Sequence, residues 1–227
     1  MLRKLAVAAK NVLTIGYLHS GERVHPDFPN ENFANHLKVY KFMAQFCSPT
    51  SNVLDIGCGT GYGAAHLAQF AKQVSGIDIS SSALRFARSR YRRHNLTFVK
   101  MDAQQLEFPD DGFDLIVSTE NFEHLPNQRQ AAQEMARVLK PNGLCFVATP
   151  NPEMFEGIDN PYHEHECTFD ELRDMFGALF KEVVIIENSL SSQQDRGVIP
   201  REGFGVFGKP VDLTYLSNTH SFFCFCR

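Results

Sequence analysis

The chain has 227 residues, of which 43% are hydrophobic and 21% charged, values that are ordinary for one soluble globular domain. A net charge of −4 argues against an affinity driven by neutralising nucleic-acid phosphates, so we predict no nucleic-acid partner. No apolar run is long enough to cross a bilayer, and no membrane association is predicted.

Residues 1–48 are predicted to form a helical lead-in and lid, and residues 49–227 the main part of what is a single domain overall. Apolar residues between positions 2 and 13 recur at helical spacing, which favours an amphipathic helix over a secretion signal. The six cysteines include no C-x-x-C pair, and several lie in apolar runs. A reducing, cytoplasmic compartment fits this pattern best.

Residues 53–61 read Val-Leu-Asp-Ile-Gly-Cys-Gly-Thr-Gly, a short apolar segment that runs into closely spaced glycines. The pattern predicts a buried strand, a glycine loop and the start of a helix, which together bring backbone N–H groups close to a ligand. Tyr62 stands where the dinucleotide pattern G-x-G-x-x-G has its last glycine, so a pyrophosphate site is disfavoured. The run resembles the first motif of class I S-adenosylmethionine-dependent methyltransferases, an acidic residue followed by G-x-G-x-G.

Strand and helix patterns alternate after this loop, which predicts an α/β fold with a doubly wound, mostly parallel sheet covered on both faces. A capping box at Thr168–Glu171 begins another helix, and the runs 183–186 and 221–226 are the last two of seven predicted strands. Five arginines between residues 85 and 93 are interpreted as a solvated helix face. The predicted elements between the glycine loop and residue 150 are helices over 64–71, 81–93 and 128–139 and strands over 73–79, 96–101, 113–118 and 144–148.

Four predicted strands end in acidic or polar residues, at the edge where open parallel sheets bind ligands. A carboxylate at Asp55 can orient the glycine loop or reach the methionine amino group. Asp78 follows the first glycine by about twenty residues, the usual spacing for an acid that binds ribose hydroxyls. Ile79 is positioned to cover adenine, Asp102–Ala103 to bind the adenine amine, and Ser118–Asn121 to face the methionine and the methyl donor. The predicted cofactor-binding residues are Asp55, Gly57, Gly59, Gly61, Asp78, Ile79, Asp102, Ala103 and Glu120.

Each of these residues also has a structural interpretation, because a strand-end aspartate is usually a turn or cap residue. The resemblance favours the functional one. From about residue 52 to 151 the chain is similar to the small-molecule branch of class I methyltransferases, through Ile77–Ser80, Glu123–Leu125 and Arg137–Gly143 among other motifs. It implies a Rossmann-like methyltransferase domain with an antiparallel last strand and S-adenosylmethionine as the cofactor. Asn142 stands where the family often has a second glycine, at a position that needs a positive φ.

Two flanking segments resemble methyltransferases associated with glycosyltransferases and polysaccharide biosynthesis. They are residues 21–23 with 36–42 in the lead-in, and 149–151 with 160–166 after the fifth strand. The resemblance implies methyl transfer to a hydroxyl of a small molecule, a sugar or glycan precursor, although the lead-in departs from the pattern at Val24–Pro26. Two alternatives stay open: an O-methyltransferase of a phenolic, quinone or other secondary metabolite, and a catalytically inactive S-adenosylmethionine-binding protein.

A hydroxyl acceptor must lose a proton, which calls for a general base. His163 and His165 are the predicted catalytic residues, because they lie on a loop expected over the acceptor pocket and their alternate spacing points both the same way in an extended chain. The alternative is that this loop only shapes the lid and caps the next helix. We predict no metal site, since ligands at alternate positions in residues 163–167 strain a tetrahedral cage. A catalytic magnesium ion remains an open alternative.

Overall fold

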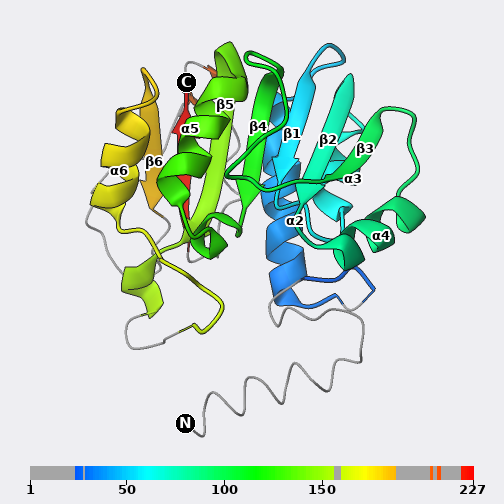
Figure 1. Ribbon diagram of the computed structural model, residues 1–227, viewed down its shortest axis with the longest axis horizontal. Coiled ribbons are helices and arrows are strands. Elements are labelled where there is room, and N and C mark those ends of the chain that lie inside the picture. Colours follow the sequence, from blue (N-terminus) through cyan, green and yellow to red (C-terminus); the bar gives the residue numbers. More distant parts are fainter. Residues whose placement is uncertain (1–23, 28, 156–159, 188–204, 207–208, 211–220) are drawn as a thin grey trace, which may run out of the picture.

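The computed structural model describes residues 24–27, 29–155, 160–187, 205–206, 209–210 and 221–227. Its centre is a seven-stranded sheet in the order β3-β2-β1-β4-β5-β9-β6 (Figure 1). Strands β1 to β5 pair in parallel, whereas β9 runs antiparallel to both β5 and β6. This confirms the predicted seven-stranded sheet with an antiparallel last strand. The strands are β1 Asn52–Ile56, β2 Gln73–Asp78, β3 Leu96–Lys100, β4 Phe113–Thr119, β5 Leu139–Pro150, β6 Val183–Glu187 and β9 Ser221–Cys226, with a separate pair β7 Gly205–Val206 and β8 Lys209–Pro210.

Helices cover both faces of the sheet. A hydrophobic cluster lies on each face, because successive side chains of a strand point to opposite faces. One cluster packs α2, α3 and α4 against residues such as Val53 and Val117, and the other packs α5 and α6 against residues such as Leu54 and Ile116. Figure 1 shows α5 and α6 on the viewer's side of the sheet and α2 on the far side. The described helices are α2 Glu31–Met43, η1 Ala44–Phe46, α3 Tyr62–Leu67, α4 Ser81–Arg90, η2 Phe122–His124, α5 Gln128–Val138, η3 Pro152–Phe155 and α6 Phe169–Gly177.

The predicted helix caps are present. The Ser80 hydroxyl accepts a hydrogen bond from the Ala83 amide at 3.3 Å and begins α4. Thr168 and Glu171 form a reciprocal capping box at the start of α6, which satisfies amides that have no partner within the helix. The described part of the predicted lead-in contains α2, whereas the amphipathic helix predicted between residues 2 and 13 lies outside the described residues.

Strand β5 begins at Leu139, five residues earlier than the apolar pattern predicts. Leu139 pairs with Phe113 of β4, and the register then shifts before Leu144 pairs with Leu115. Asn142 lies inside this irregular stretch with φ of +65°, in the left-handed region where asparagine is the commonest non-glycine residue. The expected positive φ is therefore observed, within a strand instead of before one.

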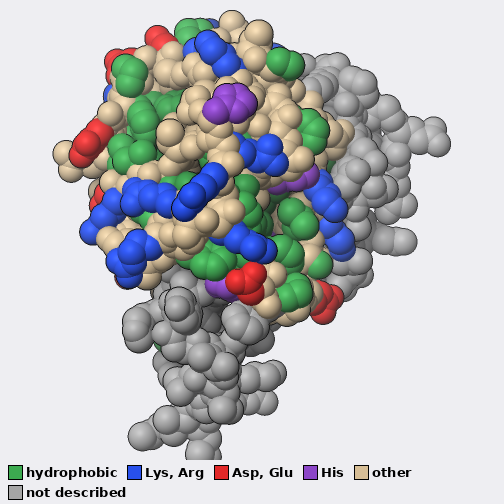
Figure 2. Space-filling view, turned by 90° about the vertical axis from the view of Figure 1, so that its right-hand side faces the viewer, with side chains coloured by type: hydrophobic (Ala, Val, Ile, Leu, Met, Phe, Trp, Pro, Cys, Tyr) green, Lys and Arg blue, Asp and Glu red, His purple; other side chains and the backbone are tan. Residues whose placement is uncertain are grey.

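The basic side chains around the end of α4 lie on the edge of the molecule formed by α4 and β3. Figure 2 shows this face, where Lys and Arg side chains gather. Arg88 donates to the carbonyl oxygen of Phe98 from two of its nitrogens, at 3.1 and 2.7 Å, and Arg90 lies 3.7 Å from the Asp27 carboxylate. Arg88 thus joins α4 to β3, a structural role that the sequence pattern did not indicate.

All six cysteines lie in the described part of the chain and are free thiols, five of them buried. Burial raises the pKa of Cys145 and Cys167 to about 12, so both are protonated small apolar groups at neutral pH. Among the described residues, no helix combines the length and apolar character needed to span a bilayer.

Candidate functional site

The glycine loop between β1 and α3 folds back onto β2. Gly57, Gly59 and Gly61 have φ of +71°, +53° and +84°, conformations that glycine adopts without strain. The Cys58 amide donates to the Ile77 carbonyl at 2.8 Å, which fixes the loop against the end of β2. A Cβ on Gly57 would lie 2.3 Å from the Asn121 side chain, so the loop after β4 packs directly on this glycine. The loop thus brings the ends of β1, β2 and β4 together, as predicted.

Asp78 and Ile79 form a polar and apolar pair at the end of β2. The Asp78 carboxylate accepts hydrogen bonds from the Gly59 amide at 2.9 Å and the Ser80 amide at 2.7 Å, which hold it in one orientation. Ile79, the next residue, is 69% exposed, although large apolar side chains are usually buried. A fixed carboxylate beside an exposed apolar surface suits a ligand with hydroxyl groups next to a flat ring, such as a nucleoside.

Asp55 is a fully buried carboxylate on β1 beside this loop. Its Oδ1 accepts a hydrogen bond from the Tyr40 hydroxyl at 2.9 Å, whereas its Oδ2 is buried and has no hydrogen-bond partner. Burial raises the pKa of Asp55 to about 7, the Tyr40 hydrogen bond opposes this, and the negative charge of Asp78 adds to it. A buried oxygen without a partner is costly, and a ligand amino group would satisfy it. Tyr40 is a site residue that the sequence analysis missed.

Gly63 lets α3 approach Tyr40 closely, and Gly63→Ala is expected to destabilise the fold by about 2 kcal/mol. An added Cβ would lie 2.1 Å from the ring of Tyr40, which is 3% exposed and has no room to move. Chemical denaturation measures this loss. Gly177→Ala is the matched control, because a Cβ there meets nothing within 4 Å and stability should be unchanged or slightly raised. Equal stability of the two variants would contradict the close packing.

Asp102 and Ala103, predicted to bind adenine, have separate surroundings. Asp102 is exposed, and its Oδ1 accepts from the backbone and side-chain nitrogens of Gln104 at 2.9 and 3.0 Å, as in a common turn. Ala103 is 6% exposed and packs in the cluster on the α5 side of the sheet. Their assignment to the cofactor stays a prediction.

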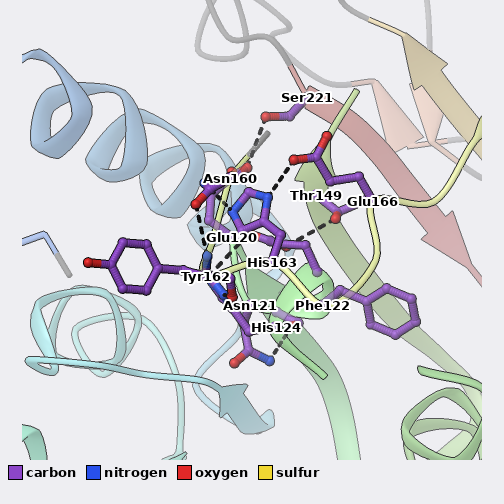
Figure 3. A network of polar contacts seen from close by, with 12 residues as sticks. Glu120, Asn121, Phe122, His124, Thr149, Asn160, Tyr162, His163, Glu166 and Ser221 are labelled. Carbon is purple, nitrogen blue, oxygen red and sulfur yellow. Dashed lines mark hydrogen bonds and ion pairs between the residues drawn. The ribbon is translucent and has the colours of Figure 1, made fainter. Parts of the chain in front are cut away.

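Glu120 follows β4 with a positive φ of +47°, which is unusual for glutamate. The Ser221 hydroxyl at the start of β9 donates to its Oε1 at 2.9 Å (Figure 3). Since Asn121 packs on Gly57, Glu120 lies between the glycine loop and the start of β9. This position agrees with the predicted strand-end cluster.

Glu123 is a second buried carboxylate that the sequence analysis assigned no role. It is 1% exposed, and the Thr149 hydroxyl donates to its Oε2 at 3.0 Å. Burial raises its pKa well above the ordinary value, and the charge of Glu120 contributes in the same direction. Its Oε1 lies 3.7 Å from Nε2 of His124, the next residue. The sequence resemblance included the motif Glu123–Leu125. It did not reveal that the carboxylate is buried, because this depends on contact with β5.

The two predicted bases face different partners, so the expectation that they point the same way is wrong. His163 is held between Glu166, whose Oε1 lies 2.5 Å from Nδ1, and Asn160, whose amide nitrogen lies 3.0 Å from Nε2 (Figure 3). His165 is half-exposed, and its Nε2 lies 3.2 Å from Glu171 at the start of α6. The chain bends at residue 164 because two successive amides, of residues 164 and 165, donate to one carbonyl oxygen. An extended segment would have been needed for the predicted geometry.

The His163 ring packs against His124, with 5.0 Å between ring centroids. The structure therefore gathers Glu123, His124 and His163 on one side of the strand ends, and Asp55, Asp78 and Ile79 with the glycine loop on the other. Glu120 and Asn121 connect the two groups. A fixed carboxylate beside an exposed apolar side chain, next to a cluster of titratable side chains, suits a group-transfer reaction.

Residues 54–147 match the family described as methyltransferase domain. Over these residues the chain is similar to a methyltransferase domain. A probable S-adenosylmethionine-dependent methyltransferase of Mycobacterium tuberculosis is 38% identical over 176 residues, which are 75% of this chain and 62% of the relative. A fatty-acid O-methyltransferase of Mycolicibacterium smegmatis is 37% identical over 102 residues, covering 44% of this chain and 37% of that protein. The chain thus spans less than two thirds of the length of these relatives.

The chain also has the expected fold. The crystal structure of the YcgJ protein of Bacillus subtilis aligns with 87% of this chain and 99% of its own, with a TM-score of 0.59 and 20% sequence identity. At this identity the likeness concerns the fold alone. It confirms the predicted Rossmann-like fold. The family match falls on the residues where the sequence resemblance was found.

Proposed function

We propose that the protein is an S-adenosylmethionine-dependent methyltransferase that transfers a methyl group to a hydroxyl of a small molecule, with a sugar or glycan precursor as the acceptor class. The observation that carries the proposal is the alignment of Asp55, Asp78 and Ile79 along the ends of β1 and β2. Two carboxylates and an exposed apolar side chain, held beside a glycine loop, match the polar and apolar parts of this cofactor.

The residues present fit the cofactor on structural grounds. The buried Asp55 Oδ2, which has no partner among the described residues, would accept from the methionine amino group, and Asp78 from the ribose hydroxyls. Ile79 would cover one face of the adenine, and Asp102 and Ala103 are the proposed partners of its amine. When bound, S-adenosylmethionine supplies a methyl group on a positively charged sulfur.

His163 is the residue proposed to receive the proton of the acceptor hydroxyl. A carboxylate only accepts hydrogen bonds, so the contact with Glu166 keeps the proton of a neutral imidazole on Nδ1 and leaves the lone pair on Nε2. His165 instead contacts Glu171 of the capping box, and we propose that it positions the loop between η3 and α6. The sugar class rests on the resemblance of residues 149–151 and 160–166 to polysaccharide-associated methyltransferases.

A carboxylate is the second acceptor class to test, because one relative bears the name fatty-acid O-methyltransferase. A carboxylate is already ionised at neutral pH and needs no general base. Transfer of radiolabelled methyl groups from S-adenosylmethionine should therefore be measured with nucleotide sugars, phenols, quinols and fatty acids in parallel. Transfer to sugars supports the proposal, transfer to another class replaces the acceptor, and cofactor binding without any transfer favours an inactive binding protein.

Asp78→Ala is expected to raise the dissociation constant of S-adenosylhomocysteine about 10- to 150-fold, because hydrogen bonds to a charged group contribute roughly 1.5–3 kcal/mol. Isothermal titration calorimetry with the wild-type chain and the variant measures this directly. Asp174→Ala is the matched control, since Asp174 is an exposed carboxylate on α6. An unchanged constant in Asp78→Ala would remove this residue from the site, and no binding by the wild type would overturn the proposed function.

A further inference from the structure

Three metal-ligating side chains converge beside the proposed cofactor residues. Glu123 and His124 belong to η2, and His163 lies on the loop before α6. One ligand atom from each lies within 4.8 Å of the others. We propose that Glu123, His124 and His163 form a binding site for a divalent transition-metal ion, which the sequence analysis did not predict.

The hydrogen bonds around both imidazoles fix which nitrogen can ligate an ion. Nδ1 of His124 lies 2.9 Å from the carbonyl oxygen of Tyr162, and Nδ1 of His163 lies 2.5 Å from a carboxylate oxygen of Glu166 (Figure 3). Carbonyl and carboxylate oxygens only accept, so a neutral ring carries its proton on Nδ1 and its lone pair on Nε2. Histidines that bind metals characteristically donate the other N–H to such an oxygen.

The carboxylate of Glu123 is oriented in the same manner. Thr149 donates to Oε2, which leaves Oε1 on the side of His124, 3.7 Å from Nε2. The group is 1% exposed, and an ionised carboxylate in such surroundings is costly unless a cation compensates it. A divalent ion at the convergence point provides that compensation.

The donor set indicates the class of ion. Two imidazoles and one carboxylate suit zinc, manganese, iron or cobalt in the divalent state, whereas magnesium prefers oxygen ligands. Three protein ligands leave coordination positions open, as in catalytic metal sites. Asn160 donates to Nε2 of His163, so an ion must displace this hydrogen bond when it binds.

The inference rests on the proposed function and deepens it, because the open positions are suited to the oxygen of an acceptor hydroxyl. An oxygen bound to a divalent ion loses its proton more readily. With the ion present, Nε2 of His163 is a ligand, and the hydroxyl proton leaves to solvent instead of passing directly to the imidazole.

A second cluster of possible ligands, His165, Cys167 and Glu171, serves as an internal comparison. Glu171 is already engaged in the capping box, and the buried Cys167 thiol donates to Gln128 at 3.0 Å. Burial raises the thiol pKa to about 12, which disfavours the thiolate that a metal requires. This second cluster is therefore expected to stay empty under conditions that fill the first.

Titration of the full chain with Co²⁺, followed by its visible absorption, tests the site. We expect one equivalent to bind with ligand-field bands and without the near-ultraviolet band of a thiolate–cobalt bond. His124→Ala and Glu123→Gln should weaken binding about 100-fold or more, whereas Cys167→Ser should leave it unchanged. S-adenosylhomocysteine affinity and thermal unfolding of each variant report whether it is folded.

Three results would overturn the cation site: no visible bands with the wild type, bands that persist in a folded His124→Ala variant, or bands that depend on Cys167. Methyl transfer after chelation with EDTA separates the two proposals. Full activity without metal would overturn the role of the ion in proton removal, while the proposed methyltransferase activity stands. If the wild type fails to bind S-adenosylhomocysteine, the proposed function is lost, and the Co²⁺ titration still decides the cation site.

Discussion

Asp55→Asn is expected to remove the contribution of Asp55 to the pH dependence of folding stability between about pH 4 and pH 7. The folded pKa of Asp55 is about 7 and its ordinary value is 3.8, so the folded state binds the proton more tightly than the unfolded chain. The stability that this proton contributes is complete below about pH 4 and is lost as the pH rises through 7. The difference corresponds to about 4 kcal/mol as an upper value. Asparagine does not ionise, so the variant should lose this contribution and keep the slope that comes from other groups, such as Glu123, whose pKa burial also raises.

Denaturant unfolding at intervals from pH 4 to pH 8 measures this difference. The phenols that face Asp55, Tyr40 and Tyr62, have pKa values raised by burial and stay neutral throughout, so they do not obscure it. Asp174→Ala, which removes an exposed carboxylate on α6, should keep the wild-type slope. Equal slopes in the wild type and Asp55→Asn would show that Asp55 is not the buried titrating group.

The same carboxylate predicts a pH-dependent affinity for S-adenosylhomocysteine. Its amino group is cationic at neutral pH and requires the ionised form of Asp55, which is depleted below about pH 7. Affinity in the wild type should therefore fall about tenfold for each pH unit below 7. Asp55→Asn should bind weakly at pH 8 and show little of this slope. If Asp55→Asn is more stable than the wild type at neutral pH but binds S-adenosylhomocysteine more weakly, Asp55 serves ligand binding at a cost in folding stability.

The sequence located Asp55, Asp78 and the glycine loop because these features are local: one strand, one turn and a fixed spacing. It missed Tyr40, which lies in a helix 15 residues before Asp55 and meets it only after α2 packs on α3. The same limit applies to Gly63, whose role is to admit the Tyr40 ring. The hydrophobic periodicity of a helix or strand predicts that element, but it does not predict which residues of two elements contact each other.

The loop after β5 shows a sharper limit. Alternate spacing correctly describes where side chains point in an extended chain, but the segment is bent at residue 164 by the carbonyl oxygen of Glu123. That carbonyl belongs to η2, about forty residues away in the chain. The bend sends His163 toward Glu123 and His124 and leaves His165 at the start of α6. The sequence of this loop alone could not predict the bend, because the bend depends on contact with η2.

His163→Ala is expected to lower the turnover number by about 10²- to 10⁴-fold, the usual contribution of a positioned general base. The dissociation constant of S-adenosylhomocysteine should change less than about threefold, because the proposed cofactor residues lie along β1 and β2. His165→Ala should lose less than about tenfold, since its ring contacts the capping box of α6. His94 is an exposed residue before β3, and His94→Ala is the control: loss of its imidazole should leave the turnover number unchanged.

The measurement is single-turnover methyl transfer at saturating acceptor, because this isolates the chemical step from product release. Normal turnover in His163→Ala would show that no proton transfer or coordination passes through this ring, as expected for a carboxylate acceptor. A loss that appears only in the affinity for S-adenosylhomocysteine would move His163 to the cofactor pocket. The turnover loss is expected whether the ring takes the proton itself or holds a metal ion that acidifies the hydroxyl. His124→Ala separates these roles: it retains the proton-accepting nitrogen of His163 but removes a metal ligand, so a comparable loss indicates coordination.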